Sequence, residues 1–187
     1  MSYYETIYEY AADNYGLITS TQAKELEVPS IELVKLSHRN RLQRIWYGVY
    51  RISHYIPTPL DRYAEAVAIV GEDSFIYGES VLAMHGLALV NPTVLSVATS
   101  KRVRKTLPKY IKKVNVKEIS NIVYYEGIPS QDIVSAISVC SKQIMTERLI
   151  TAVNEAEEQG LISNDEKKYL KESLSIWALN RQIVDAT

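Results

Sequence analysis

The stretch TSTQAKELEVPSIELVKLSHRNRLQRIWYGVYRI, residues 19–52, decides the fold of the first part of this chain. Thr19 and Gln22 have the spacing of a capping box, in which the two side chains satisfy free N–H groups at the start of a helix. The proline before Ser30 separates this helix from a second one, because the residue before a proline avoids helical angles and Ser30 is a good N-cap. We therefore expect two short helices joined by a tight turn, the second running from about Ser30 to Arg39.

The second helix has two different sides. At 100° per residue, Leu33 and Leu36 share one side, which is expected to face a core. The opposite side mixes apolar residues with cations and a titratable ring, and together with the N-cap and the flanking arginine it comprises Ser30, Ile31, Val34, Lys35, His38 and Arg39. Such a surface suits the major groove of DNA, where aliphatic groups meet thymine methyls and polar groups meet base edges and phosphates.

A β-hairpin is expected directly after this helix. Residues 41–46 and 49–52 alternate apolar and polar positions around Tyr47-Gly48, which is a hairpin signal. Its arginines are Arg41, Arg44 and Arg51. A helix-turn-helix followed by a basic hairpin is a winged helix, which predicts binding to double-stranded DNA. The alternative is a small helical bundle with an ordinary solvated basic face.

Charge is distributed unevenly along the 187 residues, although the net charge is only −1. Residues 1–60 carry six basic and six acidic side chains, residues 61–117 nine and five, and residues 118–187 six and eleven. The middle of the chain is therefore positive and its tail negative. A single cysteine, Cys140, excludes an internal disulfide, and we see neither a signal peptide nor an apolar run long enough to cross a membrane. These features predict a cytoplasmic protein without a membrane contact.

The segment SHYIPTPL, residues 53–60, is the expected linker, because it holds two prolines and no periodicity. We place a DNA-binding domain at 1–56 and a second domain at 57–187, with few contacts across the boundary. The second domain is expected to combine helices and strands, so the fold class is α+β. Its helices are predicted at 61–70, 78–85, 129–139, from a cap at Ser141 to 159, and from a capping box at Ser163 onward. Its strands are predicted at 93–99, 110–116 and 122–125.

A run of cations from Lys101 to Lys117 contains no acidic residue. It includes Lys101, Arg102, Arg104 and Lys105, followed by four further lysines. One interpretation is a second DNA contact, since cations bound to phosphates release condensed counterions. The other is a solvated loop and sheet edge, which lysines protect from pairing.

No catalytic pattern is visible in the sequence. The three histidines are scattered, without cysteines or carboxylates at the spacing of metal ligands. Neither a nucleophile elbow nor a phosphate-binding glycine loop is present. We expect a non-enzymatic protein with no metal and no cofactor.

The chain resembles the AbiEi-type antitoxins of bacterial abortive-infection systems, which are type IV toxin–antitoxin systems. In the first domain the resemblance lies in Leu33 to Leu36, in Leu42-Gln43-Arg44 and in Gly48-Val49-Tyr50-Arg51. In the second it lies in His85-Gly86-Leu87 and in Gly127-Ile128-Pro129. Two positions depart from the family: Tyr47 replaces a basic residue at the wing turn, and Asn40 replaces a glycine after the recognition helix.

The resemblance implies a winged helix followed by an antitoxin domain. It implies a protein that represses its own operon by binding repeats in the promoter. It also implies that the protein counteracts a co-encoded nucleotidyltransferase-like toxin, as part of phage defence, without forming a stable complex with that toxin. Two alternatives remain open from the residues: a transcriptional regulator whose second domain binds a small effector, and a nucleic-acid-processing enzyme.

Overall fold

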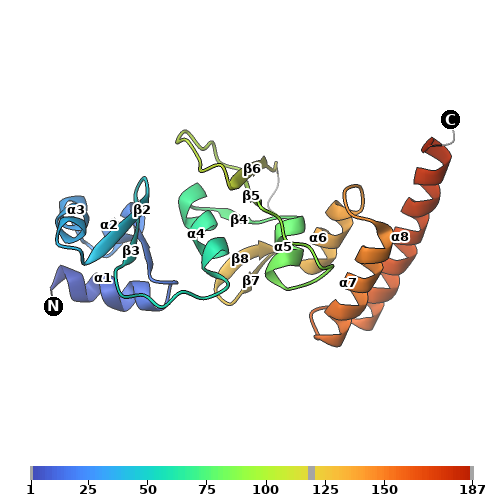
Figure 1. Ribbon diagram of the computed structural model, residues 1–187, viewed down its shortest axis with the longest axis horizontal. Helices are drawn as coiled ribbons and strands as arrows, with labels where there is room; N and C mark the ends of the chain where they lie inside the picture. The colour runs from blue at the N-terminus through green and yellow to red at the C-terminus, as the bar shows by residue number, and fades with distance from the viewer. Residues whose placement is uncertain (1, 118–120, 186–187) are drawn as a thin grey trace.

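Three parts follow one another along the long axis of the molecule (Figure 1): an N-terminal unit, a central sheet with its helices, and a group of C-terminal helices. The structure is a computed structural model that describes residues 2–117 and 121–185. Helices and two separate sheets give an α+β protein, as the sequence predicts.

The N-terminal unit has the element order of a winged helix. Its sheet is antiparallel with the strand order β1-β3-β2, and β2 and β3 form the expected hairpin around Tyr47-Gly48. Large side chains such as Ile7, Ile18 and Leu33 fill a small core between the helices and this sheet. Its elements are α1 (Tyr3–Ala12), β1 (Leu17–Thr19), α2 (Ser20–Glu25), α3 (Ser30–His38), β2 (Leu42–Trp46) and β3 (Val49–Ile52).

Local sequence signals explain most boundaries in this unit. The capping box of α2 is present, with Gln22 N–H donating to Thr19 Oγ1 at 3.2 Å and Thr19 N–H donating to Gln22 Oε1 at 2.9 Å. Asn40 follows α3 at φ 55°, so asparagine does replace glycine in a left-handed helix end. The assignment of Ser30 as N-cap was wrong: Pro29 is the N-cap and makes no side-chain hydrogen bond, and Ser30 is the first helical residue.

The central sheet has five strands in the order β6-β5-β4-β8-β7. Neighbouring strands β4 and β8, and likewise β5 and β6, run parallel, whereas β4–β5 and β7–β8 are antiparallel. The elements here are α4 (Asp61–Val70), β4 (Ser74–Ile76), α5 (Glu79–Met84), β5 (Leu95–Thr99), β6 (Ile111–Asn115), β7 (Ile122–Tyr125) and β8 (Ile128–Gln131).

Two predictions for the following segment were wrong. Residues 129–139 do not form one helix: β8 occupies the first part, and α6 (Ile133–Cys140) begins after Asp132, whose side chain accepts a hydrogen bond from Ser135 N–H. Ser141 does not cap the next helix but ends α6, and α7 (Thr146–Glu158) starts after Met145. The capping box at Ser163 is present and starts α8 (Asn164–Asp185).

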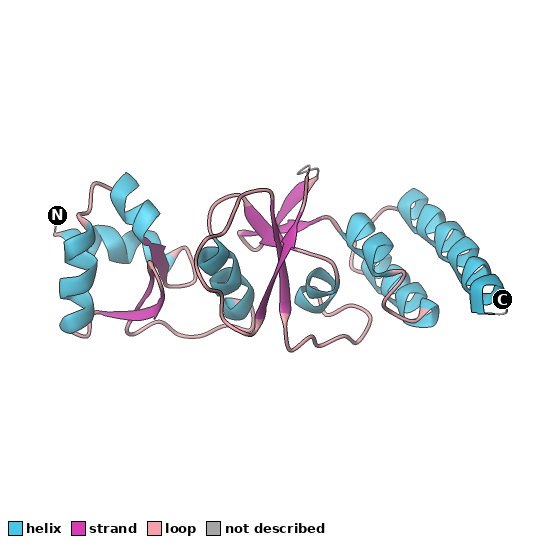
Figure 2. Cartoon of the chain, turned by 90° about the horizontal axis from the view of Figure 1, so that it is seen from above, coloured by secondary structure: helices cyan, strands magenta, loops and turns pink. Residues whose placement is uncertain are grey.

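The C-terminal helices pack side by side at the end of the molecule farthest from the winged-helix unit (Figures 1 and 2). Buried Leu149 and Val153 of α7 and buried Leu170 and Leu174 of α8 join the apolar core of the central sheet. The helices therefore extend the second domain and leave the winged-helix unit uncovered by them.

The expectation of few contacts across the domain boundary was wrong. Leu17 of β1 and Val49 of β3 belong to the same buried cluster as Tyr63 and Ala66 of α4. Each removes apolar surface from water at the junction, and burial of one such side chain stabilises by roughly 1.5–3 kcal/mol. The two domains are joined by a packed interface as well as by the linker.

We predict that Gly16→Ala destabilises the protein by more than about 2 kcal/mol. Gly16 has φ +67°, which costs an L-residue roughly 1–2 kcal/mol, and a Cβ there would lie 2.6 Å from Tyr55 Cγ. Gly160→Ala is the matched control, because Gly160 has φ +69° but nothing within 4 Å of the added atom. Urea denaturation measures both, and equal losses for the two variants would contradict the close packing of Tyr55 on Gly16.

Candidate nucleic-acid interface

The outward side of α3 is solvent-exposed, as its 100° spacing predicts. Leu33 and Leu36 are buried in the core, whereas Ile31 and Val34 expose 57% and 41% of their surface. The polar residues expected on this side are exposed with them: Ser30, Lys35, His38 and Arg39. Two exposed aliphatic side chains surrounded by polar and cationic groups form a surface that can meet base edges in a groove.

Lys35 is the cation at the centre of this surface. Its Nζ lies 2.7 Å from Glu32 Oε1 one helical turn earlier, and its side chain is half-exposed. An exposed pair at this spacing contributes well under 1 kcal/mol, so the ammonium can exchange Glu32 for a phosphate or a base.

The hairpin supplies further cations beside α3. Arg44 is exposed on β2, and its guanidinium carbon lies 5.2 Å from the centroid of the Tyr47 ring. Tyr47 itself is 63% exposed at the wing turn. A positive charge therefore lies at the wing tip although tyrosine occupies the turn. Arg41, at the start of the hairpin, is exposed and leans on the Tyr4 ring of α1 at 5.2 Å.

Arg51 does not belong to this surface, which corrects its assignment as a DNA-binding residue. Because successive strand residues point to opposite faces, Tyr50 and Ile52 enter the winged-helix core while Arg51 faces α4. Its side chain is 17% exposed; Nη1 lies 3.3 Å from Glu65 Oε2, and Nη2 lies 3.7 Å from Asp61 Oδ2. Arg51 therefore pairs with two carboxylates of α4, whereas it was expected to contact a DNA phosphate.

The basic run begins in the loop that connects β5 and β6, residues 100–110. Arg102 and Arg104 are exposed, and burial lowers the pKa of the half-buried Lys105. Lys101 is held at 2.6 Å from Asp73 and 3.7 Å from Glu72, and the same contacts raise its pKa. Glu72 and Asp73 are distant from the run in sequence, and their negative charges reduce the repulsion among its cations.

This loop lies against the wing. Trp46 Nε1–H of β2 donates a hydrogen bond to the carbonyl of Thr106 at 3.0 Å. In Figure 1 the β2–β3 turn and the β5–β6 loop lie on the same, upper side of the molecule. The loop that carries the start of the basic run therefore contacts the wing, which sequence spacing alone did not reveal.

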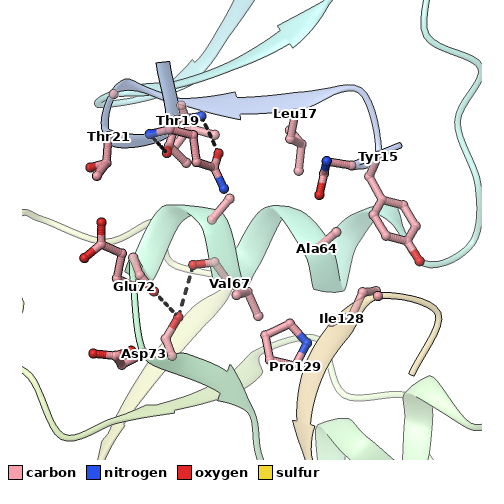
Figure 3. A pocket seen from close by; sticks show the side chains of 18 of the residues that line it. Tyr15, Leu17, Thr19, Thr21, Ala64, Val67, Glu72, Asp73, Ile128 and Pro129 are labelled. Atoms are coloured by element: carbon pink, nitrogen blue, oxygen red, sulfur yellow. Dashed lines mark hydrogen bonds between the residues drawn. The ribbon is translucent and has the colours of Figure 1, made fainter. Parts of the chain in front are cut away.

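A cleft of about 600 Å³ lies between the winged-helix unit and the central part, beside their packed interface (Figure 3). Leu17, Val67 and Pro129 give it apolar walls, and carboxylates such as Glu72 and Asp73 lie at its edge. The cleft could not be predicted from the sequence, because β1, α4 and β8 meet there only through the tertiary fold.

Cys140 is buried and His85 is half-buried, and burial shifts the pKa of both. Burial and the nearby Glu79 raise the pKa of the Cys140 thiol to about 12, so the nucleophilic thiolate is scarce. Burial lowers the pKa of His85 to about 4, and its ring packs against the Tyr125 ring with centroids 4.0 Å apart and planes tilted by 41°. Within residues 2–117 and 121–185, no cluster of three His, Cys, Asp or Glu side chains could hold a metal ion. No helix in this described part is long and apolar enough to span a membrane.

Comparison with protein families gives a match within the first unit. Residues 5–53 match the family model described as a transcriptional regulator, AbiEi antitoxin. The match begins in α1 and ends just after β3, so it confirms the resemblance for the winged-helix unit. A search of curated proteins gave no match for the chain.

We predict that Arg51→Ala lowers the free energy of unfolding by about 2 kcal/mol, because it leaves two mostly buried carboxylates without their cation. Arg44→Ala removes the same charge from an exposed position and should change stability by less than about 0.5 kcal/mol. Urea denaturation of both variants tests this, and equal stability would contradict the structural role of Arg51.

Proposed function

We propose that this protein is a DNA-binding autorepressor of its own operon and the antitoxin of a type IV toxin–antitoxin system. The winged-helix domain, residues 1–56, would read the promoter, and the second domain, residues 57–187, would provide the antitoxin activity. The family match in residues 5–53 supports regulation and antitoxin action in general.

The observation that carries the DNA-binding proposal is the exposed side of α3. Ile31 and Val34 expose apolar surface to water, which is unfavourable in free energy, and contact with thymine methyls would remove that surface from water. Lys35 lies between them and the cations at the helix end. The direct readout of bases is therefore assigned to Ser30, Ile31, Val34, Lys35 and His38, with Arg39 at a phosphate.

Phosphate contacts are assigned to the wing and the β5–β6 loop. Arg41 and Arg44 are exposed on the hairpin, and Arg102 and Arg104 are exposed on the loop that contacts it. Lys101 and Lys105 complete the set as weaker contributors, since Lys101 is ion-paired and Lys105 is half-buried. Such contacts fix the register of the protein on the duplex without reading sequence.

The antitoxin part of the proposal rests on the resemblance. The expected target is a co-encoded nucleotidyltransferase-like toxin. Because the toxin would be neutralised without a stable complex, this protein needs no surface that binds it. The second domain has the size and the polarised charge for a separate role, and we assign it no enzymatic activity.

A regulator that responds to a small effector is the second candidate. The cleft of about 600 Å³ between the domains favours it, because a ligand there would touch both the wing turn and α4. Loss of promoter binding on addition of a small molecule would distinguish this candidate from the antitoxin.

We predict that Lys35→Ala weakens binding to a duplex from the protein's own promoter by roughly 1–3 kcal/mol, with the loss confined to one base position if Lys35 reaches a base. Lys168→Ala on α8 removes the same charge at the far end of the molecule and should leave the affinity unchanged. Fluorescence anisotropy with single-base variants of the duplex measures both. Equal affinity of Lys35→Ala and the parent would refute the assigned role of α3.

We predict that the two activities separate by domain in the full-length chain. Val34→Glu with Arg44→Ala places a negative charge on the groove-facing side and removes a cation from the wing, at exposed positions that leave the core intact. Promoter repression should be lost, with binding weakened by about 2 kcal/mol or more, while cells that express the neighbouring toxin still grow. Loss of growth rescue together with repression, at normal protein levels, would contradict the domain assignment.

A further inference from the structure

The interface between the domains contains a connected set of polar side chains that leads from the wing to the basic loop. Arg51 of β3 contacts Glu65 of α4 at 3.3 Å, and Glu65 Oε1 accepts a hydrogen bond from the Tyr110 hydroxyl at 2.5 Å. Tyr110 immediately precedes β6 and closes the β5–β6 loop. The contact between Trp46 and Thr106 joins the other strand of the wing to the same loop.

These contacts are well placed to control geometry. Arg51 and Glu65 side chains are mostly buried, so solvent screens their attraction less than that of a surface pair. Asp61 adds a second carboxylate to Arg51, and its Oδ1 accepts hydrogen bonds from Tyr55 and Thr58 of the linker. The linker, the wing and the loop are therefore tied to one helix, α4.

We infer that Arg51, Glu65 and Tyr110 are positioning residues for DNA binding, which hold the β5–β6 loop beside the wing so that one duplex meets both. This inference rests on the proposed DNA-binding function. The three need not touch DNA themselves; they act by holding the loop that carries Arg102 and Arg104 against the wing. A loop freed from this set still carries its charge but loses its orientation, and ordering it again on DNA costs conformational entropy.

Glu65→Ala gives the sharpest test, because positioning and simple electrostatics predict changes in DNA affinity of opposite sign. Removal of a negative charge from a DNA-binding protein ordinarily strengthens binding. Positioning predicts the opposite: the dissociation constant for the promoter duplex rises about tenfold. The salt dependence should also weaken, by roughly 0.9 in slope for each phosphate contact that is lost. Fluorescence anisotropy at several salt concentrations measures both quantities.

A double-mutant cycle identifies the loop as the part being positioned. The triple variant Arg102→Ala, Arg104→Ala, Lys105→Ala should weaken binding in the parent protein but add little in the Glu65→Ala background. Additive losses would overturn the inference, since they would mean that the loop contributes equally with and without Glu65. Unchanged or tighter binding by Glu65→Ala would overturn it as well.

Tyr110→Phe provides a second variant in case Glu65→Ala does not fold. It removes only the hydroxyl that donates to Glu65. Like Glu65→Ala, it should weaken the salt dependence of binding and reduce the further loss caused by the triple loop variant. Tyr15→Phe is its matched control, because the Tyr15 hydroxyl crosses the boundary to the Glu126 carbonyl and does not reach the loop. Equal behaviour of the two variants would overturn the inference. Failure of the parent protein to bind any promoter duplex would instead refute the proposed function.

Discussion

The attraction between the Arg51 guanidinium and the carboxylates of Asp61 and Glu65 is the constraint on which the arrangement of this molecule depends. Arg51 lies on the face of β3 that is turned away from the winged-helix core, and both carboxylates lie on the first turns of α4. Burial of these charges is costly unless they are paired, so the pairing restricts the two domains to orientations in which all three groups meet. Apolar contacts of Leu17 and Val49 with α4 stabilise the same orientation.

This constraint bears directly on the proposed DNA-binding surface. A winged helix alone offers one recognition helix and one hairpin, which is a small interface. With α4 held against β3, the β5–β6 loop lies beside the wing, and Trp46 bonds to it. Basic segments that are separated by about sixty residues in sequence are thus in contact, while the acidic C-terminal helices lie at the far end of the molecule. This polarity favours one orientation of the molecule toward a polyanion.

Several local features were predicted correctly from neighbouring residues, although the caps expected at Ser30 and Ser141 were not. The Thr19–Gln22 capping box, the Tyr47-Gly48 hairpin and the left-handed Asn40 each depend on a few consecutive side chains, and each is present. The exposed side of α3 followed from helical periodicity alone.

Features set by tertiary contacts were missed. Arg51 resembled any other wing arginine, because its partners on α4 are ten and fourteen positions away and only the packing brings them together. The sequence predicts a helix from residue 129, because Pro129-Ser130 is a common helix start, but pairing with β4 and β7 makes residues 128–131 a strand. The three-residue β4 is too short to show any periodicity.

The most direct test of DNA recognition by α3 is photo-crosslinking from a benzoylphenylalanine placed at position 31, in the full-length protein bound to a duplex from its own promoter. Ile31 lies on the exposed side of α3 that we propose enters the groove. Tyr169 on α8 has a similar exposed fraction at the opposite end of the molecule, so the same probe at position 169 is the control. The proposed interface predicts a crosslink from position 31 to bases of the duplex and none from position 169. A crosslink from position 169 with none from position 31 would contradict it.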